Sequence, residues 1–304
     1  MSAALFRRGD VLWADAFGLA DVERGEEATP EHQYRIGSIT KTFTAAAVMQ
    51  LRDAGELDLD DSLEQHLPKA EHGAPTLRQM LSHLSGLQRE VPGDVWESLE
   101  FPERGDALLE AFAGSEQVLA RGSHWHYSNL GYSMLGEVVA QRSGMPYERW
   151  VEERLLGPVG LERTTWYPVA PYAKGYFVEP YEDVARPEAL PDLLGKRPSG
   201  QLWSTTTDLA RWSSFLAAPD PEVLRPETAA EMRSFHGLSD PVAWTVGYGL
   251  GLELFRDGDR ILFGHSGGMP GFVTWFAHSV ADDLGAAVLT SSTTSQRART
   301  LCLE

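Results

Sequence analysis

A serine and a lysine three residues apart, in Ser38-Ile39-Thr40-Lys41, are the first candidates for nucleophilic chemistry. Residues at this spacing lie on the same side of a helix, one turn apart. The Ser38 hydroxyl would stand at the helix amino terminus, where free N–H groups and the dipole favour a developing alkoxide. Lys41 can accept its proton if burial lowers the proton affinity of the amine. Of the four lysines, at positions 41, 69, 174 and 196, only Lys41 follows a serine by three residues.

The triplet Tyr127-Ser128-Asn129 is the second candidate. A tyrosine can act as a general acid or base when a nearby cation stabilises its phenolate. An asparagine amide can donate a hydrogen bond to a substrate carbonyl. Asn129 is the only asparagine in the chain, so the triplet has no competitor. Taken alone, however, the triplet is better explained by a core tyrosine and a turn asparagine.

The segment Gly264-His265-Ser266-Gly267-Gly268 is the third candidate and matches the G-x-S-x-G elbow of α/β-hydrolases, which would make Ser266 the nucleophile. That elbow requires a helix after the serine, then an acid and a histidine. Pro270-Gly271 and the alternating apolar residues after them predict a turn and a strand instead. The only later histidine is His278, with no acid between it and Ser266. An α/β-hydrolase using Ser266 is therefore the disfavoured alternative.

The three segments occur in the order of the three motifs of serine β-lactamases and DD-peptidases, and their spacing resembles the class C β-lactamase and esterase-like branch. Two further segments resemble that branch, MLSHLSGL (80–87) and GQLWSTTTDLARW (200–212). The resemblance extends from about residue 4 to residue 292.

The resemblance implies a serine hydrolase that acts on ester or amide bonds through an acyl-enzyme. Ser38 would attack the carbonyl, Lys41 and Tyr127 would share the proton transfers, and Asn129 would orient the substrate. The backbone N–H groups of Ser38 and Gly268 would form the oxyanion hole. No cofactor is implied. A non-catalytic binding or sensor protein on the same fold is the second alternative.

The resemblance also implies that His265, Ser266, Gly267 and Gly268 bind the substrate on an edge strand beside the nucleophile. The absence of side chains at the two glycines would let the substrate backbone approach the strand. His265 stands where many relatives carry a lysine, so a permanent positive charge is missing. We therefore expect a substrate carboxylate to be held less firmly, which leaves esters, amides and D-amino-acid peptides as candidate substrates.

Composition restricts the possible partners. The 304-residue chain has a formal charge of −18, which disfavours nucleic acid. It has a single cysteine, Cys302, and His124 and His126 lack the further ligands of a zinc site, so no metal is expected. No apolar run approaches the ~20 residues of a membrane span. The amino-terminal residues do not resemble a signal peptide, so the chain as written indicates a cytoplasmic protein, or a periplasmic or secreted one whose leader was removed.

The elements that must position these residues follow from the hydrophobic pattern. Residues 3–17 and 247–292 predict strands, and helical spacing is found in the five segments 38–55, 76–87, 130–144, 146–160 and 205–217. Strands at both chain ends can share one antiparallel sheet. We therefore expect an α/β fold of the α+β type, with a sheet flanked by helices and a large inserted helical region, as in β-lactamases and transpeptidases.

We expect the sheet part to comprise residues 1–60 and 198–304, the helical part to comprise residues 61–197, and the active site to lie between them. The chain enters its first strand within a few residues of Met1 and stops about a dozen residues after the last one. Related proteins carry longer covering helices there, so one sheet face is expected to be partly uncovered. Large exposed apolar faces are rare in monomers, which makes a homo-oligomer possible.

Overall fold

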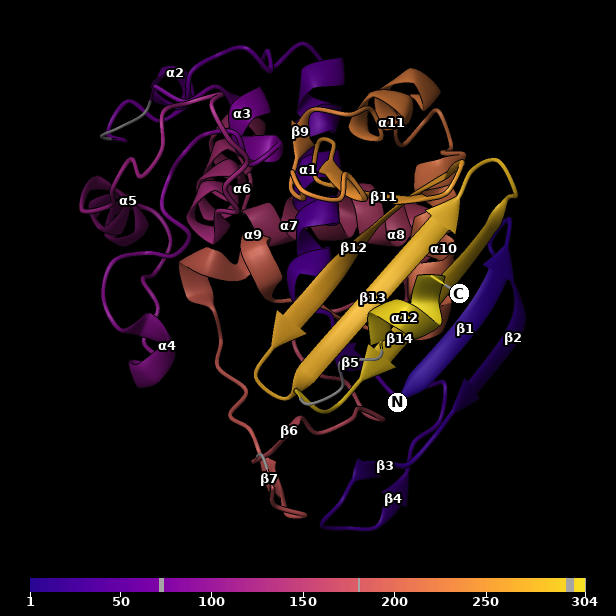
Figure 1. Ribbon diagram of the computed structural model, residues 1–304. Helices are drawn as coiled ribbons and strands as arrows, with labels where there is room; N and C mark the ends of the chain where they lie inside the picture. Colours follow the sequence, from indigo (N-terminus) through magenta and orange to yellow (C-terminus); the bar gives the residue numbers. More distant parts are fainter. Residues whose placement is uncertain (71–73, 180, 294–297, 304) are drawn as a thin grey trace.

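The computed structural model describes residues 1–70, 74–179, 181–293 and 298–303. Eight antiparallel strands form one sheet (Figure 1). Their spatial order is β2 (Asp10–Ala16), β1 (Ser2–Arg7), β14 (Leu284–Thr290), β13 (Phe272–Ser279), β12 (Arg260–Met269), β11 (Glu253–Asp257), β10 (Val246–Tyr248) and β9 (Gly237–Leu238). The expected sharing of one sheet by the two chain ends is confirmed, because β1 pairs with β14.

The helices lie in the remaining chain, separated by loops and short strands. In order they are η1 (Gly37–Ile39), α1 (Thr40–Asp53), α2 (Leu63–His66), α3 (Leu77–Leu81), α4 (Val95–Ser98), α5 (Asp106–Ala113), α6 (Asn129–Ser143), α7 (Tyr147–Val151), η2 (Glu152–Leu156), α8 (Gly157–Val159), η3 (Leu194–Lys196), α9 (Arg197–Gly200), α10 (Thr206–Ala217), α11 (Pro226–Met232) and α12 (Ala298–Leu303). Three short antiparallel pairs lie outside the sheet: β3 (Leu19–Asp21) with β4 (Glu26–Glu27), β5 (Tyr34–Arg35) with β8 (Trp203–Ser204), and β6 (Tyr176–Val178) with β7 (Ala185–Pro187). No helix of the described residues is long and apolar enough to cross a membrane.

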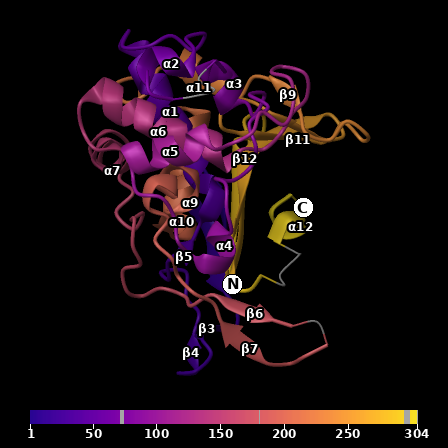
Figure 2. The same ribbon diagram turned by 90° about the vertical axis from the view of Figure 1, so that its left-hand side faces the viewer.

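The sheet separates two unequal helical layers (Figure 2). Helices α1, α6 and α10 lie on one side, where most of the buried apolar side chains gather. Phe43 of α1 stacks on Trp212 of α10 with ring centroids 4.0 Å apart, which fixes these two helices against each other. The short helix α12 lies on the other side and packs on β13 and β14 around a small cluster that includes Cys302. These layers confirm the expected fold class.

Three details of the expected elements are wrong. Residues 247–255 form two strands, because the chain turns through Gly251 at φ +81° and a Cβ there would lie 2.2 Å from the Cβ of Ala45. In 76–87 only Leu77–Leu81 is helical, and the chain then bends at His83, whose φ is +58°.

The third detail concerns the strand of the GHSGG segment. Strand β12 is an interior strand, since β11, β10 and β9 continue the sheet beyond it. However, β11 pairs with β12 only as far as Gly264. The half of β12 from His265 onward therefore pairs on one side with β13 and faces the turn that carries Ser38 with its other side. The division into a sheet part and an inserted helical part stays a prediction.

Candidate active site

The turn η1 presents Ser38 to a cavity of about 750 Å³, and α1 continues directly from it. Gly37, immediately before the serine, adopts φ +54°, and a Cβ there would lie 2.9 Å from the backbone nitrogen of Gly268. A side chain at position 37 would therefore push the turn away from β12. This close contact brings the Gly268 N–H beside the nucleophile turn, as an oxyanion hole made by these two segments requires.

Lys41 lies beneath Ser38 and is completely buried. Its Nζ donates to the Ser38 Oγ at 3.1 Å and to the backbone oxygen of Ser199 at 2.6 Å. The Tyr127 ring centroid is 4.8 Å from the same nitrogen. Burial lowers the pKa of the Lys41 amine well below its usual value, with neighbouring charges as smaller influences. A lysine in this state can accept the serine proton at moderate pH.

Tyr127 lines the same cavity as Ser38, and the interaction between the two side chains tends to lower the pKa of the phenol. Burial raises the pKa of the phenol, and the Ser38 contact opposes this only in part. The protonated phenol is thus the stable form in the free protein. Because burial favours the neutral forms of both Lys41 and Tyr127, the amine is available to accept a proton and the phenol still holds one to donate.

Asn129 is the first residue of α6, and the Ser128 hydroxyl caps that helix by accepting from the Gly131 N–H at 2.9 Å. The Asn129 Nδ2 donates to Glu90 Oε1 at 2.5 Å, whereas its buried Oδ1 has no partner in the described residues. The orientation of this amide follows from that hydrogen-bond network. The amide N–H group that the sequence assigned to a substrate carbonyl is therefore committed to Glu90, and the free oxygen is an acceptor.

Glu90 and Lys196 support this asparagine and were not found from the sequence. The Lys196 Nζ donates to Glu90 Oε2 at 2.5 Å, is buried, and lies 4.6 Å from the Trp96 ring centroid. The carboxylate of Glu90 is therefore shared between a buried cation and the Asn129 amide. In the sequence, Arg89-Glu90 looks like an ordinary surface charge pair, and no spacing connects it to residue 196.

His265 lies beneath the cavity rather than on its wall. It is fully buried, its Nδ1 donates to the Ser266 backbone oxygen at 2.6 Å, and its Nε2 accepts from the Tyr248 hydroxyl at 2.9 Å. Burial lowers its pKa to about 3, and the nearby Lys41 acts in the same direction. The imidazole is thus neutral and fixes the local strand geometry. It does not reach the cavity lining where the sequence placed it as a substrate contact.

The two glycines of the segment differ in what they face. A Cβ on Gly267 would lie 2.0 Å from the backbone oxygen of Ile36, so this glycine admits the nucleophile turn rather than a substrate. Gly268 lines the cavity, and a Cβ there would meet no atom within 4 Å. Of the two glycines, Gly268 is therefore the one that leaves free space toward the cavity.

Ser266 also lines the cavity, but it is not set up as a nucleophile. It lies within β12 and is followed by the turn to β13, with no helix after it. Its Oγ donates to Glu253 Oε1 at 2.7 Å. The histidine that the elbow would require, His278, is hydrogen-bonded to Ser213 at 3.3 Å and not to Ser266. The elbow interpretation is therefore wrong.

Three further histidines, His83, His124 and His126, belong to segments next to Tyr127 or to the accessory segment 80–87. His83 accepts a hydrogen bond at Nδ1 from the Ser128 N–H at 3.1 Å, so it supports the loop that carries Tyr127. Between His124 and His126, it is Trp125 that lines the cavity. The described residues contain no group of three or more histidine, cysteine, aspartate or glutamate side chains arranged to hold a metal.

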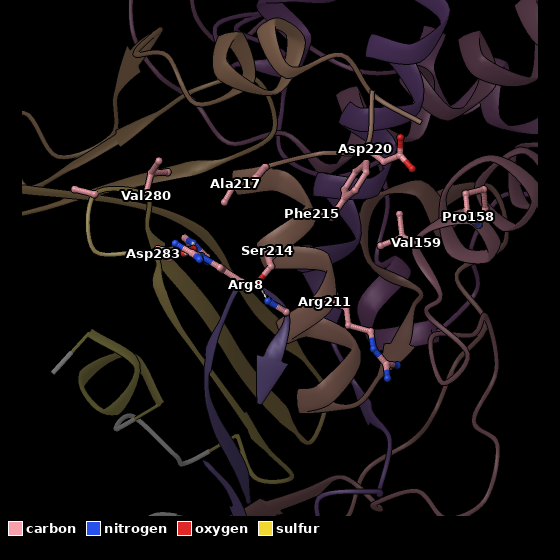
Figure 3. Close-up of a pocket in the computed structure, with 14 residues that line it drawn as sticks. Arg8, Pro158, Val159, Arg211, Ser214, Phe215, Ala217, Asp220, Val280 and Asp283 are labelled. Carbon is pink, nitrogen blue, oxygen red and sulfur yellow. Dashed lines mark hydrogen bonds and ion pairs between the residues drawn. The ribbon is translucent and has the colours of Figure 1, made fainter. Parts of the chain in front are cut away.

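A second cavity, of about 870 Å³, lies beside the carboxyl-terminal half of α10 and contains none of the three motifs (Figure 3). Its most prominent cation, Arg8, extends to Asp283 and pairs with that carboxylate at 2.6 Å. Its buried histidine, His278, has a pKa lowered by burial to about 4 and is not near a nucleophile–base pair. The cavity that contains Ser38 is therefore the candidate active site.

Comparison with known proteins agrees with this geometry. The profile of the family described as Beta-lactamase matches residues 1–302. Beta-lactamase-like protein 2 of Dictyostelium discoideum is 31% identical over 269 residues, which are 84% of this chain and 48% of that protein. The chain spans about half the length of the curated relatives it matches.

Solved structures extend the comparison. The octameric penicillin-binding protein homologue from Pyrococcus abyssi is 28% identical, with a TM-score of 0.84 over 96% of this chain and 69% of that one. A D-stereospecific amidohydrolase from Streptomyces sp. is 25% identical, with a TM-score of 0.79 over 96% of this chain and 88% of that one. The resemblance to serine β-lactamases and DD-peptidases is confirmed.

Proposed function

The chain belongs to the beta-lactamase family, and on that premise we propose that it is a serine hydrolase that cleaves ester or amide bonds through an acyl-enzyme on Ser38. The observation that carries the proposal is the 3.1 Å contact between the Ser38 hydroxyl and the fully buried amine of Lys41. Solved hydrolases such as the Streptomyces amidohydrolase share the fold, which supports hydrolysis as the reaction class.

The proton transfers follow from the two pKa directions. Lys41 takes the proton as the Ser38 oxygen attacks the carbonyl carbon, and the N–H groups of Ser38 and Gly268 stabilise the resulting oxyanion. Tyr127, protonated and in contact with Ser38, passes a proton to the leaving group as the carbonyl re-forms. Lys41 returns a proton to Tyr127. Water then attacks the acyl-enzyme by the same sequence and releases Ser38.

Neutral esters and amides fit this cavity better than substrates recognised by a carboxylate. His265 is neutral and buried, so it supplies no cation where many relatives have a lysine. We expect kcat/KM for a p-nitrophenyl ester to exceed that for nitrocefin. A strong preference for nitrocefin would contradict this argument.

Ser38→Ala and Lys41→Ala should each lower kcat/KM for a p-nitrophenyl ester by about a thousandfold or more, the scale for a nucleophile and base that act as a unit. Ser234→Ala and Lys69→Ala are the matched controls, since both side chains are exposed and outside the cavity. Substantial activity in either site variant would overturn the assignment. Retained binding without turnover in the unmodified protein would favour the sensor alternative.

We also propose that the protein self-associates. The homologue from Pyrococcus abyssi is described as octameric. Leu12 and Trp13 of the edge strand β2 are 57% and 44% exposed, which is a large apolar surface for a sheet edge.

A further inference from the structure

Glu253 and Ser266 form a polar pair on the wall of the Ser38 cavity. Glu253 begins β11 and lies opposite Gly264 of β12. The Ser266 hydroxyl donates to its Oε1 at 2.7 Å. The pair thus stands on the cavity wall formed by β11 and the half of β12 from His265 onward, next to His265, where many relatives of this family carry a lysine.

The surroundings of Glu253 leave its charge available to a ligand. Among the described residues it forms no ion pair with a lysine or arginine, and the His265 Nδ1, at 3.8 Å, already donates to a backbone oxygen. The other cavity carboxylate, Glu90, is committed to Lys196 and Asn129. The groups that face Glu253 from neighbouring elements are Lys41, Arg299, Tyr127, Tyr248, His265 and Ser266.

The protonation of Glu253 responds to what enters the cavity. Burial raises its pKa to about 7, and the hydrogen bonds from Ser266 offset this only in part. A positively charged group beside it would favour the ionised carboxylate, whereas a substrate carboxylate would be repelled by it. The exposed cation of the cavity lining, Arg89, lies 5.0 Å from the Tyr127 ring centroid and forms no ion pair with Glu253.

We propose that Glu253, supported by Ser266, is a specificity residue that selects substrates with a positively charged ammonium group near the scissile carbonyl. This inference rests on the hydrolase proposed above. The absence of a lysine explains only why a substrate carboxylate is held weakly. This inference in addition assigns a preference for cationic substrates to the side chain of Glu253. The class of substrate is an ester or amide that carries an amine or quaternary ammonium.

Matched substrate pairs test the preference. One pair is acetylthiocholine and its uncharged isostere 3,3-dimethylbutyl thioacetate, and the other is alanine p-nitroanilide, as D and L forms, with its N-acetyl derivative. In at least one pair, the charged member should have the higher kcat/KM, by about tenfold for one charge-assisted contact. Glu253→Gln should reduce that ratio to near one. The matched control is Asp257→Asn, which removes one charge from the exposed end of the same strand and should keep the ratio.

The pH dependence separates a charge contact from a purely structural role. The quaternary ammonium does not titrate, so the acetylthiocholine ratio should rise as the pH increases through about 7, where Glu253 ionises. The rise should disappear in Glu253→Gln. Ratios near one in both pairs, or a ratio that Glu253→Gln leaves intact, would overturn the inference.

Failure of the inference can be distinguished from failure of the proposed function. If Ser38-dependent hydrolysis of the neutral substrates persists while the ratios stay near one, only the ammonium preference is wrong. If no substrate is hydrolysed, a binding measurement still tests the ammonium subsite. Acetylthiocholine should change the tryptophan fluorescence of the Ser38→Ala variant when it binds, since Trp96 and Trp125 line the cavity. The affinity should fall about tenfold when Glu253→Gln is added. Equal affinity with and without Glu253 would refute the subsite.

Discussion

In the proposed mechanism the buried Lys41 amine accepts the serine proton, and this has a consequence for pH. The neutral amine is the active form, and its pKa lies well below the usual value because burial disfavours the cation. Activity should therefore be present at neutral pH and fall as the pH decreases through the pKa of Lys41. The pH profile of kcat/KM for a neutral ester measures this. A profile in which activity appears only near pH 10 would show that Lys41 behaves as an ordinary lysine.

At the residue scale, the sequence singles out the proposed catalytic pair, but not the residues that support the cavity around it. Ser38 and Lys41 are recognisable because their chemistry depends on a local helical spacing. Glu90 and Lys196 are not, because 106 positions separate them and neither has a distinctive neighbour. His265 was assigned to the substrate because a motif gives the order of residues but not the direction of a side chain.

At the scale of elements, the Glu90–Lys196 pair joins the loop after α3 to η3 and, through Asn129, to α6. Glu90→Gln leaves the buried Lys196 amine without its counter-charge. We expect a loss of about 3 kcal/mol in the free energy of unfolding, typical of breaking a buried pair from one side. Asp106→Asn, which breaks the exposed Lys69–Asp106 pair, should cost at most about 1 kcal/mol. Urea unfolding compares the two, and equal losses would show that the Glu90 pair is not structural.

The contact between η1 and β12 sets the position of the nucleophile, and Gly267 allows it. Gly267→Ala places a Cβ 2.0 Å from the Ile36 oxygen and 2.2 Å from the Thr274 hydroxyl. We expect the loss of about 1–3 kcal/mol that overpacking causes, together with reduced ester hydrolysis as Ser38 moves away from Gly268. Gly268→Ala meets no atom within 4 Å and should change unfolding by less than about 0.5 kcal/mol. Equal unfolding free energies for the two variants would contradict this close contact.

The elements themselves were largely predictable, with errors where tertiary contacts override the local pattern. Alternating residues identified β1, β2, β12, β13 and β14, and helical spacing identified α1, α6 and α10. The strand-like pattern of 247–255 concealed a turn, because Gly251 bends to pass Ala45 of α1. The edge position expected for β12 came from the family resemblance, and the structure places the short strands β11, β10 and β9 beyond it.

For the whole molecule, the exposed edge strand β2 predicts self-association. Leu12 and Trp13 should become buried between copies of the chain, so light scattering coupled to size exclusion at micromolar concentration should give a mass above 33.6 kDa. Replacing both residues by glutamate should return the mass to that of one chain, because charges on a strand edge oppose pairing. A monomer in the unmodified protein, with no binding of a hydrophobic dye, would refute the prediction.

The most direct test of the central claim is to trap the acyl-enzyme. The protein is mixed with a p-nitrophenyl ester, quenched with acid within the first turnovers, digested and analysed by mass spectrometry. We predict one acyl group on the peptide that contains Ser38, and its absence in Ser38→Ala. An acyl group on Ser266, or hydrolysis that proceeds with no acylated peptide, would contradict the assignment of Ser38 as the nucleophile.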